Sequence, residues 1–295
     1  GVSFHTEETY LLGAPDVLLA GRENPYQEQI EGYSAKGCRV LLLGMYAGAL
    51  PDETLSAGFL PIALILLSNK IRAEAPETFG YFASQGVAVK VISGDNARTV
   101  SEVAKRAGIE NADRFVDART LTTEEAIRDA AGKYTVFGRV TPAQKRSLVQ
   151  ALKADGHTVA MTGDGVNDAP SIKRADIGVG MGITGTDVTK NVADMVLADD
   201  NFATIIGACE EGRRIYDNIR KVIQFLLSAN LAEVFSVFIA TLIGFTIFQP
   251  VQLLWVNLVT DSLPALALGV EPVDEDIMKK PPTDAKKSLF AGGMT

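Results

Sequence analysis

The stretch MTGDGVNDAP, residues 161–170, packs two carboxylates and an amide into a turn broken by glycines. It follows one short apolar run, HTVAMT at 157–162, and precedes another, ADIGVGM at 175–181. Short runs that alternate with amphipathic helical patterns predict a parallel sheet with helices on both faces. In such sheets, functional groups gather at the carboxyl ends of the strands. We therefore expect an α/β fold with Asp164 and Asp168 at that edge.

The same alternation extends to both sides of this stretch. VAVKVIS at 87–93 is followed by the helical pattern ARTVSEVAKRAG, and YTVFGRV leads into a helix over AQKRSLVQALKADG. Thr141 and Pro142 begin that second helix as a cap and a first-position proline. ADMVLA at 193–198 is a further strand candidate. These patterns predict one α/β domain over residues 59–215.

The first 58 residues have a different organisation. Two short apolar runs, TYLLG and CRVLLLGMYAG, flank the turn-like segment GRENPYQEQIEGYSAKG. This pattern fits the end of a small α/β domain over residues 1–58. The opening residues, GVSFHTEETY, contain no initiator Met and read like the middle of a protein, so we expect the beginning of this domain to lie before Gly1.

Two long apolar segments follow the α/β region, at 222–248 and 251–270. Each is near or above the roughly 20 residues that cross a bilayer. Lysine and arginine flank the pair at both outer ends, which predicts that both ends are cytoplasmic. We expect a transmembrane helix pair over 216–270 and a cytoplasmic loop over 271–295. The alternative, a buried hairpin in a soluble protein, would need a very large core.

The charge balance excludes one class of partner. The net charge is -8, the pI is near 5.0, and no tract rich in Lys and Arg interrupts the sequence. A nucleic-acid partner is therefore not expected. Cys38 and Cys209 are far apart and form neither a zinc-binding nor a disulfide pattern.

The residues at the predicted strand ends point to phosphate chemistry. Glycines in ISGDN (92–96) and in the 161–170 stretch let the backbone approach a phosphate closely. Asp164 and Asp168 offer the hard oxygen ligands that Mg²⁺ prefers. Lys145 could neutralise charge on a transferring phosphoryl group. Taken singly, each feature also has a plain structural explanation, as a tight turn or a solvated lysine.

Taken together and in this order, the motifs SGDN, GRVTPAQK, TGDGVNDAP, ADIGVGMG and VLADDNF closely resemble the phosphorylation domain of P-type cation-transporting ATPases, which has the haloacid-dehalogenase fold. The resemblance covers essentially the whole chain and implies ATP as substrate and Mg²⁺ as cofactor. It implies that Asp164 and Asp168 position Mg²⁺, that Asn167 helps to hold the phosphoryl group, and that Lys145 stabilises it. The nucleotide-binding residues that it implies are Arg39, Arg72, Ser93, Gly94, Asp95 and Arg139.

The nucleophile of that family is the aspartate of a D-K-T-G-T sequence, which this chain does not contain. The resemblance therefore implies the C-terminal part of a catalytic core. The nucleophile and most of the nucleotide-binding domain are expected in a missing N-terminal portion of the same pump. We expect the isolated chain to be inactive as an ATPase.

Two positions depart from the family pattern. Leu12, in LLGAPDVLL, stands where the family usually has a lysine that faces ATP, so the lost charge is expected to weaken nucleotide binding. Asn69 stands where a hinge motif usually has Asp, although Arg72 of that motif is present. A divergent pump and a decaying gene copy both fit these changes.

Polar residues inside the two apolar segments are functional candidates, because ionisable groups in a bilayer are costly. Asn230 and Glu233 are three apart on the first segment, and Asn257, Thr260 and Asp261 share one helical face of the second. If the faces meet, five oxygen-bearing side chains converge, as suits a hard divalent cation such as Ca²⁺. Hydrogen bonding between the helices explains the amides but not the two acids.

The membrane segments sharpen the resemblance. SANLAEV and LLWVNLVTDSLPALALGVEP look like the fifth and sixth transmembrane helices of sarco/endoplasmic-reticulum-type calcium pumps. The resemblance implies Ca²⁺ as the transported ion, with Mn²⁺ left open. It also implies an integral protein of the plasma membrane, with the lipid bilayer as a partner and most of the chain in the cytoplasm.

Two other functions compete with the pump. A membrane-tethered phosphatase of the same fold predicts a nucleophilic Asp at a strand end with a second Asp two residues later, and no pair is placed in that way. The DED at 274–276 follows the membrane segments. The other alternative is a non-catalytic remnant that binds nucleotide or Mg²⁺.

Overall fold

A computed structural model describes residues 2–3, 8–19, 24–47, 59–68 and 70–283. It separates into two compact units, residues 1–202 and 203–295, which are described one at a time. The departure at Asn69 and the end of the expected loop over 271–295 lie outside the described residues.

The first unit begins with an antiparallel sheet in the order β1-β2-β3-β4. Its strands are β1 (Val2–Ser3), β2 (Glu8–Gly13), β3 (Cys38–Ala47) and β4 (Phe59–Ser68), and two helices accompany them, α1 (Pro15–Leu18) and α2 (Gln27–Ser34). The sheet and α1 enclose a small core. Its buried members are Leu11, Leu18, Leu19, Leu42, Tyr46 and Phe59.

This sheet differs from the sequence expectation at two places. β4 pairs with β3 from Cys38↔Ser68 to Tyr46↔Phe59, so the sheet continues past the expected domain boundary at residue 59. The expected turn over 21–37 contains the helix α2. Gln27 donates to the carboxylate of Glu31 one helical turn later, and pairs at this spacing stabilise short helices.

The rest of the first unit confirms the expected α/β fold with parallel strands. One three-stranded sheet has the order β5-β7-β6 and the other β10-β9-β8, and all four pairings are parallel. The strands are β5 (Val91–Ile92), β6 (Phe115–Asp117), β7 (Val136–Gly138), β8 (Ala160–Gly163), β9 (Ile177–Met181) and β10 (Met195–Leu197). The helices are α3 (Ala75–Ser84), α4 (Ala97–Arg106), α5 (Glu124–Lys133), α6 (Pro142–Ala154), α7 (Ala169–Ile172) and α8 (Asp187–Val192).

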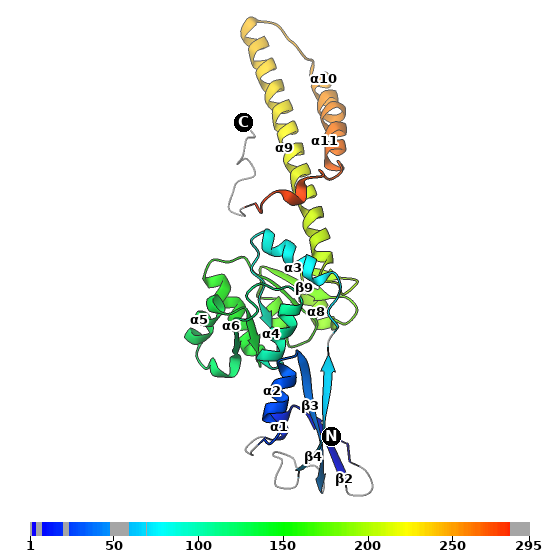
Figure 1. Cartoon of the computed structure of the whole chain (residues 1–295). Coiled ribbons are helices and arrows are strands. Elements are labelled where there is room, and N and C mark those ends of the chain that lie inside the picture. Colours follow the sequence, from blue (N-terminus) through cyan, green and yellow to red (C-terminus); the bar gives the residue numbers. More distant parts are fainter. Residues whose placement is uncertain (1, 4–7, 20–23, 48–58, 69, 284–295) are drawn as a thin grey trace. The chain divides into compact units, whose positions relative to one another are not determined.

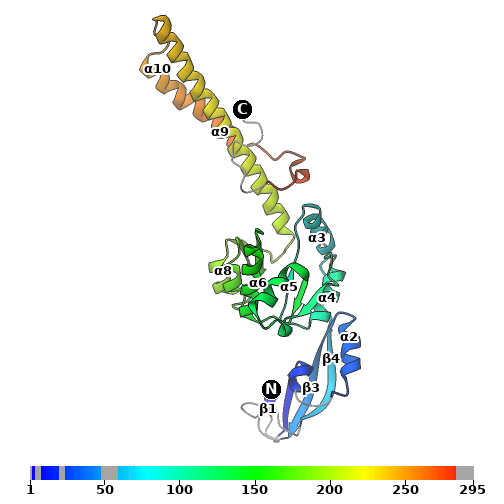
Figure 2. The same ribbon diagram turned by 90° about the vertical axis from the view of Figure 1, so that its left-hand side faces the viewer.

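Helices α5 and α6 lie side by side next to the β5-β7-β6 sheet (Figures 1 and 2). They pack on Phe137 of β7, which is almost fully buried together with Ile127 of α5 and Leu148 of α6. The start of α6 is fixed as the sequence predicts. Thr141 accepts a hydrogen bond from the Gln144 backbone, and the Gln144 side chain accepts one from the Thr141 backbone.

The second unit is a helical hairpin in which α9 (Thr204–Ile243) runs beside α10 (Pro250–Trp255) and α11 (Ser262–Gly269) (Figures 1 and 2). A π-helical turn over Val256–Asp261 joins α10 to α11. The hairpin thus consists of two rods, α9 and the continuous helix over Pro250–Gly269. Each rod is long and apolar enough to cross a membrane. The 40 residues of α9 measure about 60 Å, about twice the length that crosses the hydrocarbon core of a bilayer.

Candidate functional site

The 161–170 stretch includes the end of β8, a loop over residues 164–168 and the start of α7, so its aspartates lie at the carboxyl end of the strand as predicted. Asp168 is only 8 % exposed, and Lys145 Nζ lies 2.6 Å from Asp168 Oδ1. Lys145 reaches it from the first turn of α6. Asp164 and Asn167 are exposed on the same loop. The structure therefore brings the lysine and one carboxylate together and leaves the other carboxylate accessible.

Gly163, the last residue of β8, gives Asp168 the space that it occupies. A Cβ at position 163 would lie 2.6 Å from the Asp168 Cβ and 2.9 Å from its Cγ. Because β8 is paired with β9 at Gly163↔Gly180, the strand cannot move away to relieve such a contact. Because glycine has no side chain, the Asp168 side chain can lie directly against the end of β8.

The residues predicted on the nucleotide side meet at the ends of β5 and β7. The Arg139 N–H donates to the Asp95 carbonyl at 2.8 Å, and the Val140 N–H donates to the Ser93 carbonyl at 3.0 Å. Gly94 lies between the two residues that accept these bonds. Arg139 has a φ of 56°, a left-handed conformation that costs a non-glycine residue about 1 kcal/mol. Strain of this kind concentrates at functional sites.

Arginine side chains surround this group. The Arg39 guanidinium lies 3.4 Å from the Asp95 carboxylate, and Arg139 donates to Asp16 at 2.9 Å. Arg72 is exposed, and among the described residues it forms no hydrogen bond or ion pair with Asp95 or Arg139. Leu12 is 52 % exposed on β2. Asp16 lies in the LLGAPDVLL motif but was not among the residues predicted from the sequence, because its contact with Arg139 joins residues 123 positions apart.

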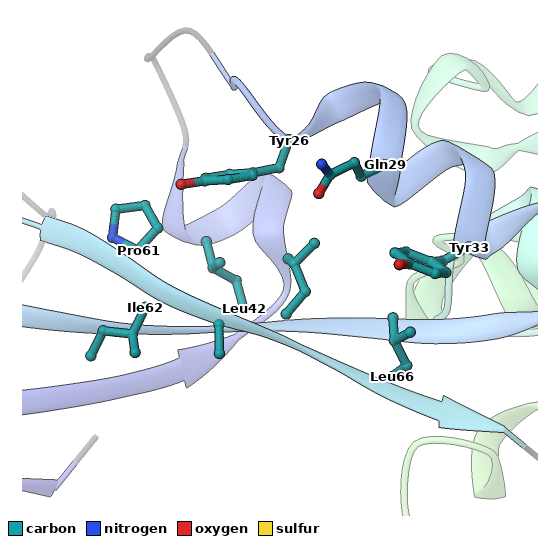
Figure 3. A pocket seen from close by; sticks show the side chains of 9 residues that line it. Tyr26, Gln29, Tyr33, Leu42, Pro61, Ile62 and Leu66 are labelled. Atoms are coloured by element: carbon teal, nitrogen blue, oxygen red, sulfur yellow. The ribbon is translucent and has the colours of Figure 1, made fainter.

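A pocket of about 250 Å³ lies away from these residues, between α2 and strands β3 and β4. Tyr26, just before α2, and Gln29 and Tyr33 on α2 line this pocket together with Leu42 and residues of β4 (Figure 3). Leu42 and Arg39 are three apart on one strand, so their side chains leave opposite faces of the sheet. The pocket is therefore on the other face from the arginine that the resemblance assigns to ATP.

Two of the predicted membrane residues meet across the helical hairpin. The Asn257 amide donates to Glu233 Oε2 at 3.1 Å and thus links the second rod to α9. Asp261 is buried, with 5 % exposure. Glu233 Oε1 and Asp261 Oδ2 are buried without a hydrogen-bond partner. Buried carboxylate oxygens are normally paired, so these two oxygens fit a cation.

The expected residues of the second rod lie within its π-helical turn, Val256–Asp261. Asp261 is buried and Asn257 bonds Glu233 of α9, whereas Thr260 is exposed. Asn230 donates to the Leu226 carbonyl of its own helix at 2.7 Å. Of the five expected residues, the structure therefore pairs Glu233 with Asn257 and buries Asp261.

The sequence that forms these strand ends matches a known family. The sequence pattern of haloacid dehalogenase-like hydrolases matches residues 9–176, more than half of the chain. The chain belongs to this haloacid dehalogenase-like family. A second pattern, described as cation transporting ATPase, C-terminus, matches residues 245–295.

Relatives of this haloacid dehalogenase-like chain confirm the resemblance to P-type cation-transporting ATPases. Calcium-transporting ATPase 1 of Bacillus cereus is 43 % identical over 291 residues, which cover 96 % of this chain and 32 % of the relative. Calcium-transporting ATPase CtpE of Mycobacterium bovis is 42 % identical over 93 % of the chain and 36 % of its own length. Calcium-transporting ATPase 4, endoplasmic reticulum-type, of Arabidopsis thaliana is 45 % identical over 78 % of the chain and 22 % of its own length. The chain thus spans between 22 % and 36 % of the length of these relatives.

A polar clamp on α9, which the sequence analysis did not identify, is a further feature of this haloacid dehalogenase-like chain. Buried Asn218 donates to the Glu271 carbonyl at 2.9 Å and to the Gly269 carbonyl at 3.4 Å. Arg213 donates to the Ile277 and Lys280 carbonyls, both at 2.8 Å. The clamp ties the segment after α11 to the first half of α9, and because it uses backbone carbonyls it leaves no sequence motif.

Proposed function

We propose that this chain is part of an ATP-driven P-type pump that transports Ca²⁺ through an aspartyl-phosphate intermediate. The nucleophilic aspartate belongs to a portion of the pump outside this sequence. The observation that carries the proposal is that each of two rods apolar enough to cross a membrane has a buried carboxylate oxygen without a hydrogen-bond partner, on Glu233 and on Asp261.

The loop after β8 supports the phosphoryl-transfer half of the proposal. Among the described residues, no three His, Cys, Asp or Glu side chains gather as a metal site. Two aspartates nevertheless suit Mg²⁺, which keeps several waters and takes its remaining ligands from substrate phosphates. Asp164 and Asp168 would hold the ion, which supplies positive charge near the transferring group. Lys145 stays beside Asp168 and adds a second cation there, while Asn167 contributes an amide.

The nucleotide side is supported by the Arg139, Asp95 and Arg39 cluster. Ser93, Gly94 and Asp95 present a glycine-containing turn, and Arg139 is held next to it by its backbone bond to Asp95. Arg39 approaches the Asp95 carboxylate, so ATP phosphates or hydroxyls that enter here would meet two arginines. Arg72 is proposed as a contact on the basis of its motif alone.

The transported ion would lie between α9 and the π-helical turn, where Glu233, Asn257 and Asp261 supply side-chain oxygens. Asn230 and Thr260 would complete the site by changing their present orientations. Ca²⁺ takes six to eight oxygen ligands, more than these residues supply, so other helices of the pump and backbone carbonyls share the coordination. Mn²⁺, which also binds oxygen ligands, is the alternative transported ion.

Helix α9 provides the coupling between the two halves. It begins seven residues after β10 ends and continues without interruption to Ile243, past Asn230 and Glu233. Arg220→Pro would break it at a cost of about 3 kcal/mol. In the pump that contains this chain, ATP hydrolysis should then continue without transport. Transport that survives this substitution would contradict the coupling.

A Ca²⁺ pump of this kind would be an integral membrane protein. The two rods would lie in the plasma membrane, with the α/β unit in the cytoplasm and the bilayer, ATP and Ca²⁺ as partners. The direct test is ATP-dependent ⁴⁵Ca²⁺ uptake into inverted membrane vesicles that contain the pump. Asp261→Asn should abolish uptake, whereas Thr241→Ala, whose hydroxyl bonds only within α9, should leave it intact. Uptake that is equal in both variants would overturn the assignment of the cation site.

A further inference from the structure

Thr189, on the short helix α8, is fully buried and contacts the loop that carries the two aspartates. Its hydroxyl donates to the Gly165 carbonyl at 3.1 Å and also lies 3.4 Å from the Asp164 carbonyl. Both carbonyls belong to the turn between β8 and Asp168. The hydroxyl of a buried side chain of α8 therefore lies within hydrogen-bond distance of the carbonyls of two consecutive peptide groups, Asp164–Gly165 and Gly165–Val166.

Thr186, the N-cap residue of α8, completes this connection. Its N–H donates to the Asp164 carbonyl at 3.0 Å, and its hydroxyl oxygen lies 2.8 Å from the Thr189 hydroxyl oxygen. The same oxygen accepts the Thr189 N–H at 3.3 Å. A hydroxyl has one proton to donate. All donors are used when Thr186 donates to Thr189 and Thr189 donates to Gly165, so the two threonines form one directed chain that ends on the loop.

We propose that Thr189 is a positioning residue for the Mg²⁺-binding loop, because its hydroxyl holds the Gly165 carbonyl and thereby fixes the direction of the Asp164 carboxylate. This inference rests on the proposed role of Asp164 and Asp168 in holding Mg²⁺. Asp168 is already held by Lys145, whereas Asp164 is exposed, so its orientation depends on the backbone to which it is attached. Thr189 restrains that backbone from the side opposite to solvent.

The test compares two substitutions at position 189 in the complete 295-residue chain in detergent. Thr189→Val keeps the shape and removes the hydroxyl, while Thr189→Ser keeps the hydroxyl and removes a methyl group. Mg²⁺ is titrated into each protein, and binding is followed by calorimetry and by the amide resonance of Gly165. Melting curves without Mg²⁺ show that each variant is folded.

Loss of one buried hydrogen bond should weaken Mg²⁺ binding by Thr189→Val about fivefold to tenfold. Thr189→Ser should bind within about twofold of the wild type. A purely structural role would lower the melting temperature of Thr189→Val and leave its Mg²⁺ affinity unchanged, and that result would overturn the inference. Equal losses in both variants would also overturn it. Absence of saturable Mg²⁺ binding by the wild-type chain would instead contradict the Mg²⁺ site of the proposed function.

Discussion

Gly163→Ala tests the packing that holds Asp168 at the end of β8. The new methyl group would meet the Asp168 Cβ at 2.6 Å and its Cγ at 2.9 Å. Since β8 is fixed by its pairing with β9, the aspartate has to move, and it is bonded to Lys145 at 2.6 Å. The substitution therefore displaces Asp168, a proposed Mg²⁺ ligand, while its carboxylate group is retained.

The expected loss of stability combines two opposing terms. Overpacking of this kind costs about 1–3 kcal/mol, whereas replacing glycine by alanine lowers the entropy of the unfolded chain and returns about 0.4–1 kcal/mol. The net effect is a loss of about 1–2 kcal/mol if the Lys145–Asp168 pair survives. If the pair breaks, the loss rises to about 3–5 kcal/mol, because the largely buried charges of Lys145 and Asp168 both lose their partner.

The assay is amide hydrogen exchange of the peptides that cover residues 157–172, with urea unfolding of the same samples. Gly132→Ala is the matched control, since Gly132 is exposed near the end of α5 and a Cβ there meets nothing within 4 Å. It should stabilise α5 by about 0.5–1 kcal/mol. Hydrogen exchange of residues 157–172 that is as slow in Gly163→Ala as in the wild type would refute the packing explanation. A gain in the free energy of unfolding, as expected for Gly132→Ala, would refute it too.

Three further predictions concern other parts of the chain. Backbone N–H groups of Ile183 and Thr184 hold the pKa of the Asp200 carboxyl down to about 2. Because the folded pKa lies below the ordinary value of 3.8, the stabilisation is present above that value and is lost as the pH falls toward 2, so the melting temperatures of wild type and Asp200→Asn should converge between pH 4 and pH 2. A constant difference over that range would contradict this. Asn218→Ala should cost about 1–3 kcal/mol and expose residues 269–280 to exchange, because two carbonyls lose their buried donor. Thr241→Ala is its control, and equal exchange in both variants would count against the clamp. Lys145→Met should lower the rate of phosphoenzyme formation by at least tenfold in the pump, while removal of Mg²⁺ should abolish the phosphoenzyme in every variant. If Lys145→Met forms the phosphoenzyme at the wild-type rate, Lys145 has no catalytic role.

Motifs and strand ends made the α/β region predictable from the sequence. The glycines of residues 161–170 and 92–96 mark turns, and the capping pair Thr141 and Gln144 marks the start of α6. The contact between Lys145 and Asp168 follows from the topology, because α6 and the loop after β8 come to the same edge. The roles of these residues in catalysis stay predictions until substitutions test them.

Other features depend on tertiary contacts that local patterns do not encode. β4 is a continuous apolar run, and only its pairing with β3 shows that it belongs to the first sheet. The hydroxyl of Thr189 and the amide of Asn218 act on backbone carbonyls far along the chain, so no spacing reveals them. The π-helical turn breaks the 3.6-residue period on which the shared face of Asn257, Thr260 and Asp261 was predicted.

The Ca²⁺ dependence of phosphoenzyme formation from ATP, compared between the wild-type pump and Glu233→Gln, tests the central claim most directly. The account predicts that, with Mg²⁺ and ATP present, Ca²⁺ supports the wild-type phosphoenzyme and Na⁺ does not, and that Glu233→Gln needs at least tenfold more Ca²⁺, because one carboxylate charge is lost from the site. Phosphoenzyme that forms with Na⁺ alone, or an unchanged Ca²⁺ requirement in Glu233→Gln, would contradict it.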